Sequence, residues 1–290
     1  MKKLLILGCL LGISLQLLAQ KPEMGTSTAL WKKPSTVDFE EAKQNGIEYV
    51  EVALNQCYRN VSEDEVIPRI HALKSKIDSA GLKVWSIHLP FSRTLDISVL
   101  DADARKSNVD IIAKMIQASA IFKPSKLVLH SSSEPIADSI REQRIEKAIE
   151  SIGVLRKYAD EIGAQLCIEN LPRTCLGNTP EELLRIVNDY PEVGICFDTN
   201  HYLTGTPVYF AQVAGHRIGT LHISDYDGVN ESHWVPLDGV ISWKELFKII
   251  TEKGYSGVYM YEALKSKNGE RATPEQLAHS FELIKPENEK

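Results

Sequence analysis

Residues 220–234, TLHISDYDGVNESHW, decide how this sequence is interpreted. The stretch begins as a short apolar strand that ends at His222, with Asp225 close behind. A polar loop then carries Glu231 and His233, two residues apart. A histidine at a strand end followed by an acidic-x-His pair is typical of the beginning of a metal site. Two histidines in a polar loop are more often simply solvated, so the rest of the chain has to decide between these interpretations.

The same form, an apolar strand with polar residues at its end and a helix behind it, recurs along the chain. Eight such units predict a closed parallel (β/α)8 TIM barrel in a single domain. A doubly wound open sheet is the competing architecture, but no glycine-rich phosphate loop follows the first strand. The predicted strands are residues 24–30, 47–53, 83–89, 127–130, 165–169, 194–198, 218–223 and 258–262, and the predicted helices are residues 37–45, 62–81, 101–122, 138–163, 179–189, 207–215, 242–254 and 274–283.

Two helix starts carry local signals. Ser62 is followed three residues later by Glu65, which is the capping-box pattern. Thr179 directly precedes Pro180, a favoured pair for an N-cap and the first helical position. Both predict that a helix begins at that point.

The first residues of the chain predict a targeting segment. Lys2 and Lys3 precede an apolar run over residues 4–18, and Ala19 offers a small-residue cleavage point. We therefore expect residues 1–19 to be a secretory signal peptide, residues 20–290 to be the barrel domain, and the protein to be exported to the periplasm or the extracellular space. The segment is short for a membrane span, so no stable membrane insertion is expected after cleavage.

The charge balance excludes one class of partner. Removal of Lys2 and Lys3 leaves 31 basic against 39 acidic residues, a net charge of −8. An acidic exported chain is poorly suited to holding a phosphate backbone, so no nucleic acid is expected as a partner. The oligomeric state stays open, a homo-oligomer included.

Metal-capable side chains follow six of the predicted strands directly. In a parallel barrel the active site lies at these carboxyl ends. Each side chain alone is more often a helix cap or a polar group at the core margin, but six successive strand ends are far less easily explained in that way. Converging carboxylates and imidazoles would repel or lose hydration unless a cation neutralised them, which predicts a divalent metal site. The strand-end residues are His88, His130, Glu169, Asp198 with His201 close behind, His222 and Glu262.

Several motifs together resemble the xylose-isomerase-like TIM-barrel superfamily, which includes sugar phosphate isomerases and epimerases, inosose dehydratases and endonuclease IV. The resemblance covers essentially the whole of the expected mature chain. Its most specific parts are Ile168-Glu-Asn170, Phe197-Asp-Thr-Asn-His201, His222-Ile-Ser-Asp225, His233-Trp-Val-Pro-Leu-Asp-Gly239 with Ile241-Ser-Trp243, and Gly254-Tyr-Ser-Gly257 leading to Glu262.

The resemblance implies a site and a chemistry. Glu169, Asp198, His222 and Glu262 match the four ligands that hold one divalent metal (Mn²⁺, Zn²⁺, Co²⁺ or Mg²⁺) in the epimerases and isomerases. His201 matches a residue that contacts substrate. Glu169 and Glu262 would be the catalytic pair, one removing a proton next to a carbonyl and the other returning one, while the metal stabilises the enediolate.

The resemblance is incomplete in two places. Ketose 3-epimerases carry a further Glu and an Arg where this chain has residues 171–175 and 226–228, so the substrate clamp is missing or different. In the other direction, five residues match the extra ligand positions of endonuclease IV, with Glu231 replacing an Asp. They are candidates for an additional metal or for substrate binding, and would favour Zn²⁺: His88, His130, His201, Glu231 and His233.

The expected export guides the choice of substrate. Sugar phosphates and genomic DNA are cytoplasmic, so a free sugar or keto-sugar is the preferred small-molecule substrate of an isomerase or epimerase. The alternative is a metal-dependent lyase or dehydratase acting on a 3-keto-glycoside or an inosose. An endonuclease IV-like hydrolase and a non-catalytic sugar-binding barrel are less favoured.

Other residues carry weaker predictions. Trp31, Arg173 and Trp234 follow strand ends and could form walls of a sugar pocket, as could Phe91. Asp225 is expected to orient a neighbouring group and not to bind metal. Two cysteines, Cys167 and Cys196, should lie inside the barrel as small buried side chains, with a disulfide between them as the alternative.

Overall fold

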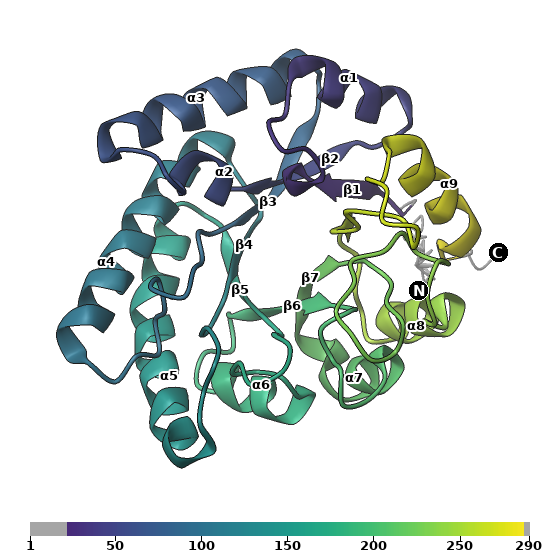
Figure 1. The fold of residues 1–290 in the computed structure, drawn as a ribbon. Helices are drawn as coiled ribbons and strands as arrows, with labels where there is room; N and C mark the ends of the chain where they lie inside the picture. Colours follow the sequence, from purple (N-terminus) through teal and green to yellow (C-terminus); the bar gives the residue numbers. More distant parts are fainter. Residues whose placement is uncertain (1–21, 287–290) are drawn as a thin grey trace, which may run out of the picture.

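Eight parallel strands form a nearly closed ring in the computed structural model, which describes residues 22–286 (Figure 1). Each strand from β1 to β6 pairs in parallel with the next one along the chain, and β1 also pairs with β8. The predicted TIM barrel is therefore confirmed. The strands are β1 (Met24–Ser27), β2 (Tyr49–Ala53), β3 (Lys83–His88), β4 (Lys126–Leu129), β5 (Gln165–Glu169), β6 (Gly194–Asp198), β7 (Ile218–His222) and β8 (Tyr259–Tyr261).

Helices surround this ring on the outside, as Figure 1 shows. In α6, Leu183, Ile186 and Val187 are buried at helical spacing, and the Thr179 hydroxyl accepts the backbone N–H of Glu182, as predicted for this start. No described helix is long and apolar enough to cross a membrane. The helices are α1 (Thr36–Gln44), α2 (Asn55–Tyr58), α3 (Glu63–Ser79), α4 (Ala102–Ser119), α5 (Asp138–Glu161), α6 (Pro180–Val187), α7 (Pro207–Ala214), α8 (Trp243–Glu252) and α9 (Pro274–Ile284), with 3-10 turns η1 (Thr28–Leu30), η2 (Ala120–Phe122) and η3 (Gly215–Arg217).

The ring closes between β7 and β8 at the carboxyl ends of the two strands. Ile223 N donates to Met260 O over 2.8 Å, and Glu262 N donates to Ile223 O over 3.1 Å. Both bonds lie beside His222 and Glu262, two of the predicted metal ligands. The seam of the barrel, meaning the junction of β7 and β8, is therefore hydrogen-bonded at the same end that carries the candidate site.

The interior of the barrel contains two free thiols. Cys167 on β5 and Cys196 on β6 are buried and pack with Val128 of β4. Burial raises the pKa of the Cys167 thiol to about 12, so it stays protonated at neutral pH. The expectation of small buried side chains is confirmed, and the alternative disulfide does not form in this structure.

Three local predictions differ from the structure. The predicted strand 24–30 ends at Ser27, because the Ser27 hydroxyl accepts the backbone N–H of Ala29 and turns the chain into η1. The Ser62 hydroxyl donates to Glu65 Oε2 over 2.9 Å and does not cap a backbone N–H, so the predicted capping box does not form. The short helix α2 was not predicted. The predicted signal peptide lies outside the described residues.

The loop after β7 is organised around the buried carboxylate of Asp225. Its Oδ2 accepts the backbone N–H of Leu237 over 3.0 Å and the indole N–H of Trp243 over 2.9 Å. Its Oδ1 accepts the backbone N–H groups of Tyr226 and Ile241. Asp225 thus orients neighbouring groups, as expected, and ties the loop that carries Glu231 and His233 to the start of α8.

We predict that Asp225→Ala will lower the free energy of unfolding by about 3 kcal/mol or more, because it leaves several buried donors without an acceptor. Chemical denaturation monitored by circular dichroism measures the effect. Asp227→Ala is the matched control: this exposed carboxylate accepts only from its own loop, at Val229 and Asn230, and its loss should change stability by less than about 1 kcal/mol. Equal effects of the two substitutions would contradict the organising role of Asp225.

Candidate metal centre

The carboxyl ends of β3 to β8 bring together all nine side chains predicted as metal ligands. Three of the groups in which potential ligand atoms lie within 4.8 Å of one another contain all nine of them. The central group is Glu169, Asp198, His222 and Glu262, the second is His88, His130 and Glu169, and the third is His201, Glu231 and His233.

The central group surrounds the imidazole of His222. His222 Nδ1 lies 3.0 Å from Glu262 Oε2, 3.1 Å from Glu169 Oε1 and 3.9 Å from Asp198 Oδ2. The side chains of Glu169, Asp198 and His222 are at most 1% exposed, whereas that of Glu262 is 14% exposed. Glu262 is therefore the member of this group that faces the solvent side.

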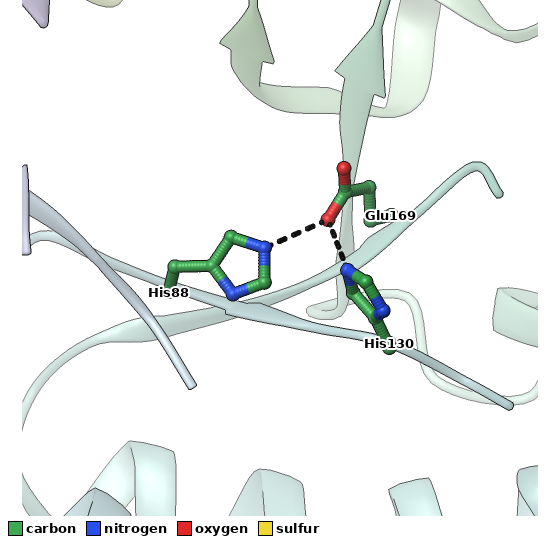
Figure 2. A group of neighbouring side chains, drawn as sticks. All are labelled: His88, His130 and Glu169. Carbon is green, nitrogen blue, oxygen red and sulfur yellow. Dashed lines mark ion pairs between the residues drawn. The ribbon is translucent and has the colours of Figure 1, made fainter. Parts of the chain in front are cut away.

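The second group shares Glu169 with the first. His130 Nε2 lies 3.0 Å and His88 Nε2 3.3 Å from Glu169 Oε2, and Figure 2 shows both rings directed at the same carboxylate. The ring of Phe91 stacks on His130 with centroids 4.2 Å apart. Phe91, predicted as a wall residue, thus forms an edge of the histidine cluster.

The third group adjoins the central one, since His201 Nδ1 lies 3.5 Å from Glu169 Oε1. Glu231 Oε1 is 3.2 Å from His233 Nε2 and 3.5 Å from His201 Nε2. The side-chain oxygen of Asn200 accepts the backbone N–H groups of Ser232 and His233, which fixes the loop after β7 against the end of β6. His201 Nδ1 lies 2.9 Å from the carbonyl oxygen of Asn170 and can donate a hydrogen bond to it. The other ring nitrogen, Nε2, then faces the carboxylates of Asp198 and Glu231.

The predicted wall residues have different surroundings. Arg173 is at the rim, where its guanidinium pairs with Glu134 at 2.8 Å and with Glu231 at 2.6 Å. Trp234 is half-buried, and the ammonium of Lys267 lies 5.5 Å from its ring centre. Trp31 is buried, and its ring meets that of Phe39 of α1 edge-on with centroids 5.4 Å apart.

The donor set fits a divalent cation. Glu169 Oε2 and Asp198 Oδ2 are buried and lack a partner with hydrogen-bond geometry, although imidazole nitrogens lie close to both. Buried carboxylate oxygens left in this way are costly unless a cation accompanies them. Carboxylates with imidazoles are ligands that Mn²⁺, Co²⁺ and Zn²⁺ accept.

Electrostatics hold the metal-free cluster in a mixed charge state. Burial disfavours protonation of His88, but the adjoining Glu169 outweighs it and raises the pKa of His88 to about 9. Burial also disfavours protonation of His201, but nearby carboxylates, chiefly Asp198, outweigh it and raise the pKa of His201 to about 10. Burial opposes ionisation of Glu262, yet His222 lowers its pKa to about 2. In the metal-free protein, positively charged imidazolium groups thus neutralise the carboxylates, as a metal ion would.

The prediction from sequence missed one buried carboxylate. Glu51, in the middle of β2, is fully buried, and its Oε2 lies 3.0 Å from His222 Nε2. The signal was a charged residue between Val50 and Val52 in an otherwise apolar strand. Glu51 lies inside its strand and not at the end, so the strand-end pattern does not select it.

Comparison with known proteins defines the family. A model of the xylose isomerase-like TIM barrel matches residues 39–286, and the chain therefore belongs to this family. It is similar to the fructoselysine 3-epimerase of Shigella flexneri, with 30% identity over 152 residues. That match covers 49% of this chain and 54% of the epimerase, about half of each.

Solved structures share the fold. A D-tagatose 3-epimerase-like protein superposes with a TM-score of 0.73 at 23% identity, covering 91% of this chain and 96% of the other. The IOLI protein, solved with a bound zinc atom, gives a TM-score of 0.69 at 17% identity and covers 90% of this chain and 96% of its own. Relatives with assigned activities thus include sugar epimerases, and at least one structural neighbour binds a divalent metal.

We predict that the metal-free protein loses stability as the pH rises from about 6.5 to about 9. The pKa of His88 is raised on folding, so its stabilising contribution is complete below about 6.5 and is lost as the pH passes about 9. The contribution is up to about 3 kcal/mol. Urea denaturation of chelator-treated protein across this range measures it.

His88→Gln should flatten this pH dependence. His71→Gln is the matched control, because His71 is exposed on α3 and its substitution should leave the profile unchanged. A profile with the same slope in wild type and His88→Gln would contradict the assignment.

Proposed function

We propose that the protein is a divalent-metal-dependent sugar isomerase or epimerase that transfers a proton at a carbon next to a carbonyl. The observation that carries this proposal is the pair of carboxylates, Glu169 at the end of β5 and Glu262 directly after β8, that meet at one nitrogen of His222. Two ionised carboxylates from different sides of a barrel can reach two sides of one small substrate. That is the arrangement that removal and return of a proton require.

The residues that would hold the metal are the central group, Glu169, Asp198, His222 and Glu262. A divalent cation there would supply positive charge to stabilise negative charge that develops on a substrate oxygen. Burial of Glu169, Asp198 and His222 keeps water away from three of the four ligands, whereas the side chain of Glu262 is partly exposed.

The proton transfers fall to Glu169 and Glu262. The neighbouring His222 keeps the pKa of both carboxyls below its usual range despite burial, so both are ionised at neutral pH and able to accept a proton. His201, buried beside Asp198 and Glu231, is placed to donate from Nε2 to a substrate hydroxyl. Return of the proton to the opposite face gives an epimer, and return to the neighbouring carbon gives an isomer.

The proposed substrate is a small sugar or keto-sugar without a phosphate group. The guanidinium of Arg173, at the rim, is engaged by Glu134 and Glu231, and the centre of the site is built from carboxylates that repel an anion. Export through residues 1–19 forms part of the proposal, because unphosphorylated sugars are the substrates available outside the cytoplasm. The activity of Shigella fructoselysine 3-epimerase supports a sugar substrate.

A lyase or dehydratase is the second candidate. The observation that favours it is the presence of two further imidazole–carboxylate groups beside the central one. Additional positive charge at His88 and His130, or at His201 and His233, would help a leaving group β to the carbonyl to depart. The first step, removal of a proton by a carboxylate, is common to both candidates.

We predict that the purified protein binds at least one divalent metal per chain and that the double variant Glu169→Gln/Glu262→Gln loses the metal of the central group. Two of its four carboxylate or imidazole ligands become neutral amides, which are weak ligands for these ions. Elemental mass spectrometry on protein loaded with Mn²⁺, Co²⁺ or Zn²⁺ measures the stoichiometry.

About one metal per chain supports the isomerase or epimerase, and two or three zinc ions per chain move the proposal toward the lyase. Glu245→Gln, an exposed carboxylate on α8, is the control and should keep the wild-type stoichiometry. A wild-type protein that binds no metal would contradict the catalytic proposal and leave a sugar-binding barrel.

We further predict that metal-loaded protein catalyses exchange of solvent deuterium into a carbon next to the carbonyl of its keto-sugar substrate. Glu169→Gln and Glu262→Gln should each slow the exchange by about 10²–10⁴-fold, because each removes one of the two proton-transfer groups. NMR of a panel of keto-sugars in D₂O detects the exchange and also reports whether an epimer, an isomer or a dehydrated product accumulates. Exchange unaffected by both substitutions would contradict these roles.

A further inference from the structure

We propose that Glu51 is a positioning residue of the metal centre, which selects the nitrogen that His222 presents to the metal. This inference rests on the proposed function, because it concerns the same metal group. No role in the proton transfers is assigned to Glu51, since the described contacts of its carboxylate are with His222 and Ser86.

Glu51 lies beneath the ligands and not among them. It projects from the middle of β2 into the barrel and is fully buried, and it is 171 residues away from His222 in sequence. Its Oε2 lies 3.0 Å from His222 Nε2 and accepts the hydroxyl of Ser86 over 2.8 Å. The Ser86 hydroxyl therefore holds the carboxylate oxygen that faces the histidine.

The two nitrogens of His222 have different surroundings. Nδ1 faces Glu169 and Glu262 in the central group, whereas Nε2 faces Glu51. An imidazole binds a metal through the nitrogen that lacks a proton, and the other nitrogen is then the donor. An ionised carboxylate is an acceptor only, so Glu51 requires the proton on Nε2 and leaves Nδ1 for the metal.

A purely structural role explains Glu51 poorly. Its second oxygen, Oε1, is buried without a hydrogen-bond partner, which destabilises the fold. A neutral side chain of similar size would fill the same space between Val50 and Val52 at a smaller desolvation penalty. The carboxylate contributes what an amide cannot: a full negative charge against the N–H of a metal-binding imidazole.

The experiment compares Glu51→Gln with wild type and with Glu48→Gln. Glu48 is the matched control, because it precedes the same strand but is 39% exposed and pairs with Lys43. Metal dissociation constants are measured by chelator competition, and the tautomer of the His222 ring is read from ¹⁵N chemical shifts of diamagnetic Zn²⁺-loaded protein. The thermal midpoint of the metal-free form reports separately on folding.

The expected result for Glu51→Gln is a metal affinity about 10–100-fold weaker than that of wild type, with Nε2–H of His222 no longer the dominant tautomer. Glu48→Gln should match wild type in both readouts. An unchanged dissociation constant and tautomer in Glu51→Gln would overturn the positioning role while leaving the metal-dependent function intact. A wild-type protein without metal affinity would overturn both.

Ser86→Ala provides the second variant if Glu51→Gln does not fold. It keeps the charge of Glu51 but removes the hydroxyl that holds Oε2, so a several-fold weaker metal affinity at an unchanged thermal midpoint supports the proposal. In either variant, metal affinity could instead fall only as far as the thermal midpoint of the metal-free protein falls. That result would identify a structural role for Glu51 and overturn the positioning role.

Discussion

The carboxylate of Glu169 and the imidazole of His222 meet inside the barrel, where neither could remain charged alone. Removing such groups from water is costly unless an opposite charge is close by, and each of these two supplies it for the other. Glu169 also contacts His88 and His130, and His222 also contacts Glu51 and Glu262, so the Glu169–His222 contact joins the first two ligand groups. The third group approaches them through His201, whose Nδ1 lies 3.5 Å from Glu169 Oε1. A parallel barrel makes this possible, because all its strands end on the same face.

The sequence predicted the barrel and the candidate ligands at strand ends from simple periodicity, whereas Glu231 and His233, in a loop, were predicted from their acidic-x-His spacing and from the resemblance. Apolar strands end where polar residues begin, and parallel strands place those ends together. The site role of Glu51 was not predicted because its partner, His222, lies on β7, far away along the chain. A strand pattern does not reveal which residues face each other across a barrel. The end of β1 was predicted wrongly because the Ser27 hydroxyl accepts a backbone N–H and turns the chain. The start of α3 after Ser62 was predicted correctly, and only the capping contact differs, because the Ser62 hydroxyl donates to the side chain of Glu65.

The loops at the rim of the site differ in sequence from the pattern of the ketose 3-epimerases. The stretches 171–175 and 226–228 lack the acidic and basic residues of the ketose 3-epimerase clamp. Instead, Arg173 joins Glu134 to Glu231 and so links the loops after β4, β5 and β7 above the site. The rim of the site is thus held together by ion pairs between three loops, separate from the buried ligand groups beneath it.

The seam between β7 and β8 has a consequence for the dynamics of the barrel. In the part of the chain that the structure describes, two backbone hydrogen bonds join these strands, both beside His222 and Glu262. Local opening of a fold begins where the fewest bonds must break. A ligand that binds His222 and Glu262 together therefore cross-links β7 and β8. Such a cross-link slows the local opening through which a protease or solvent would reach the interior.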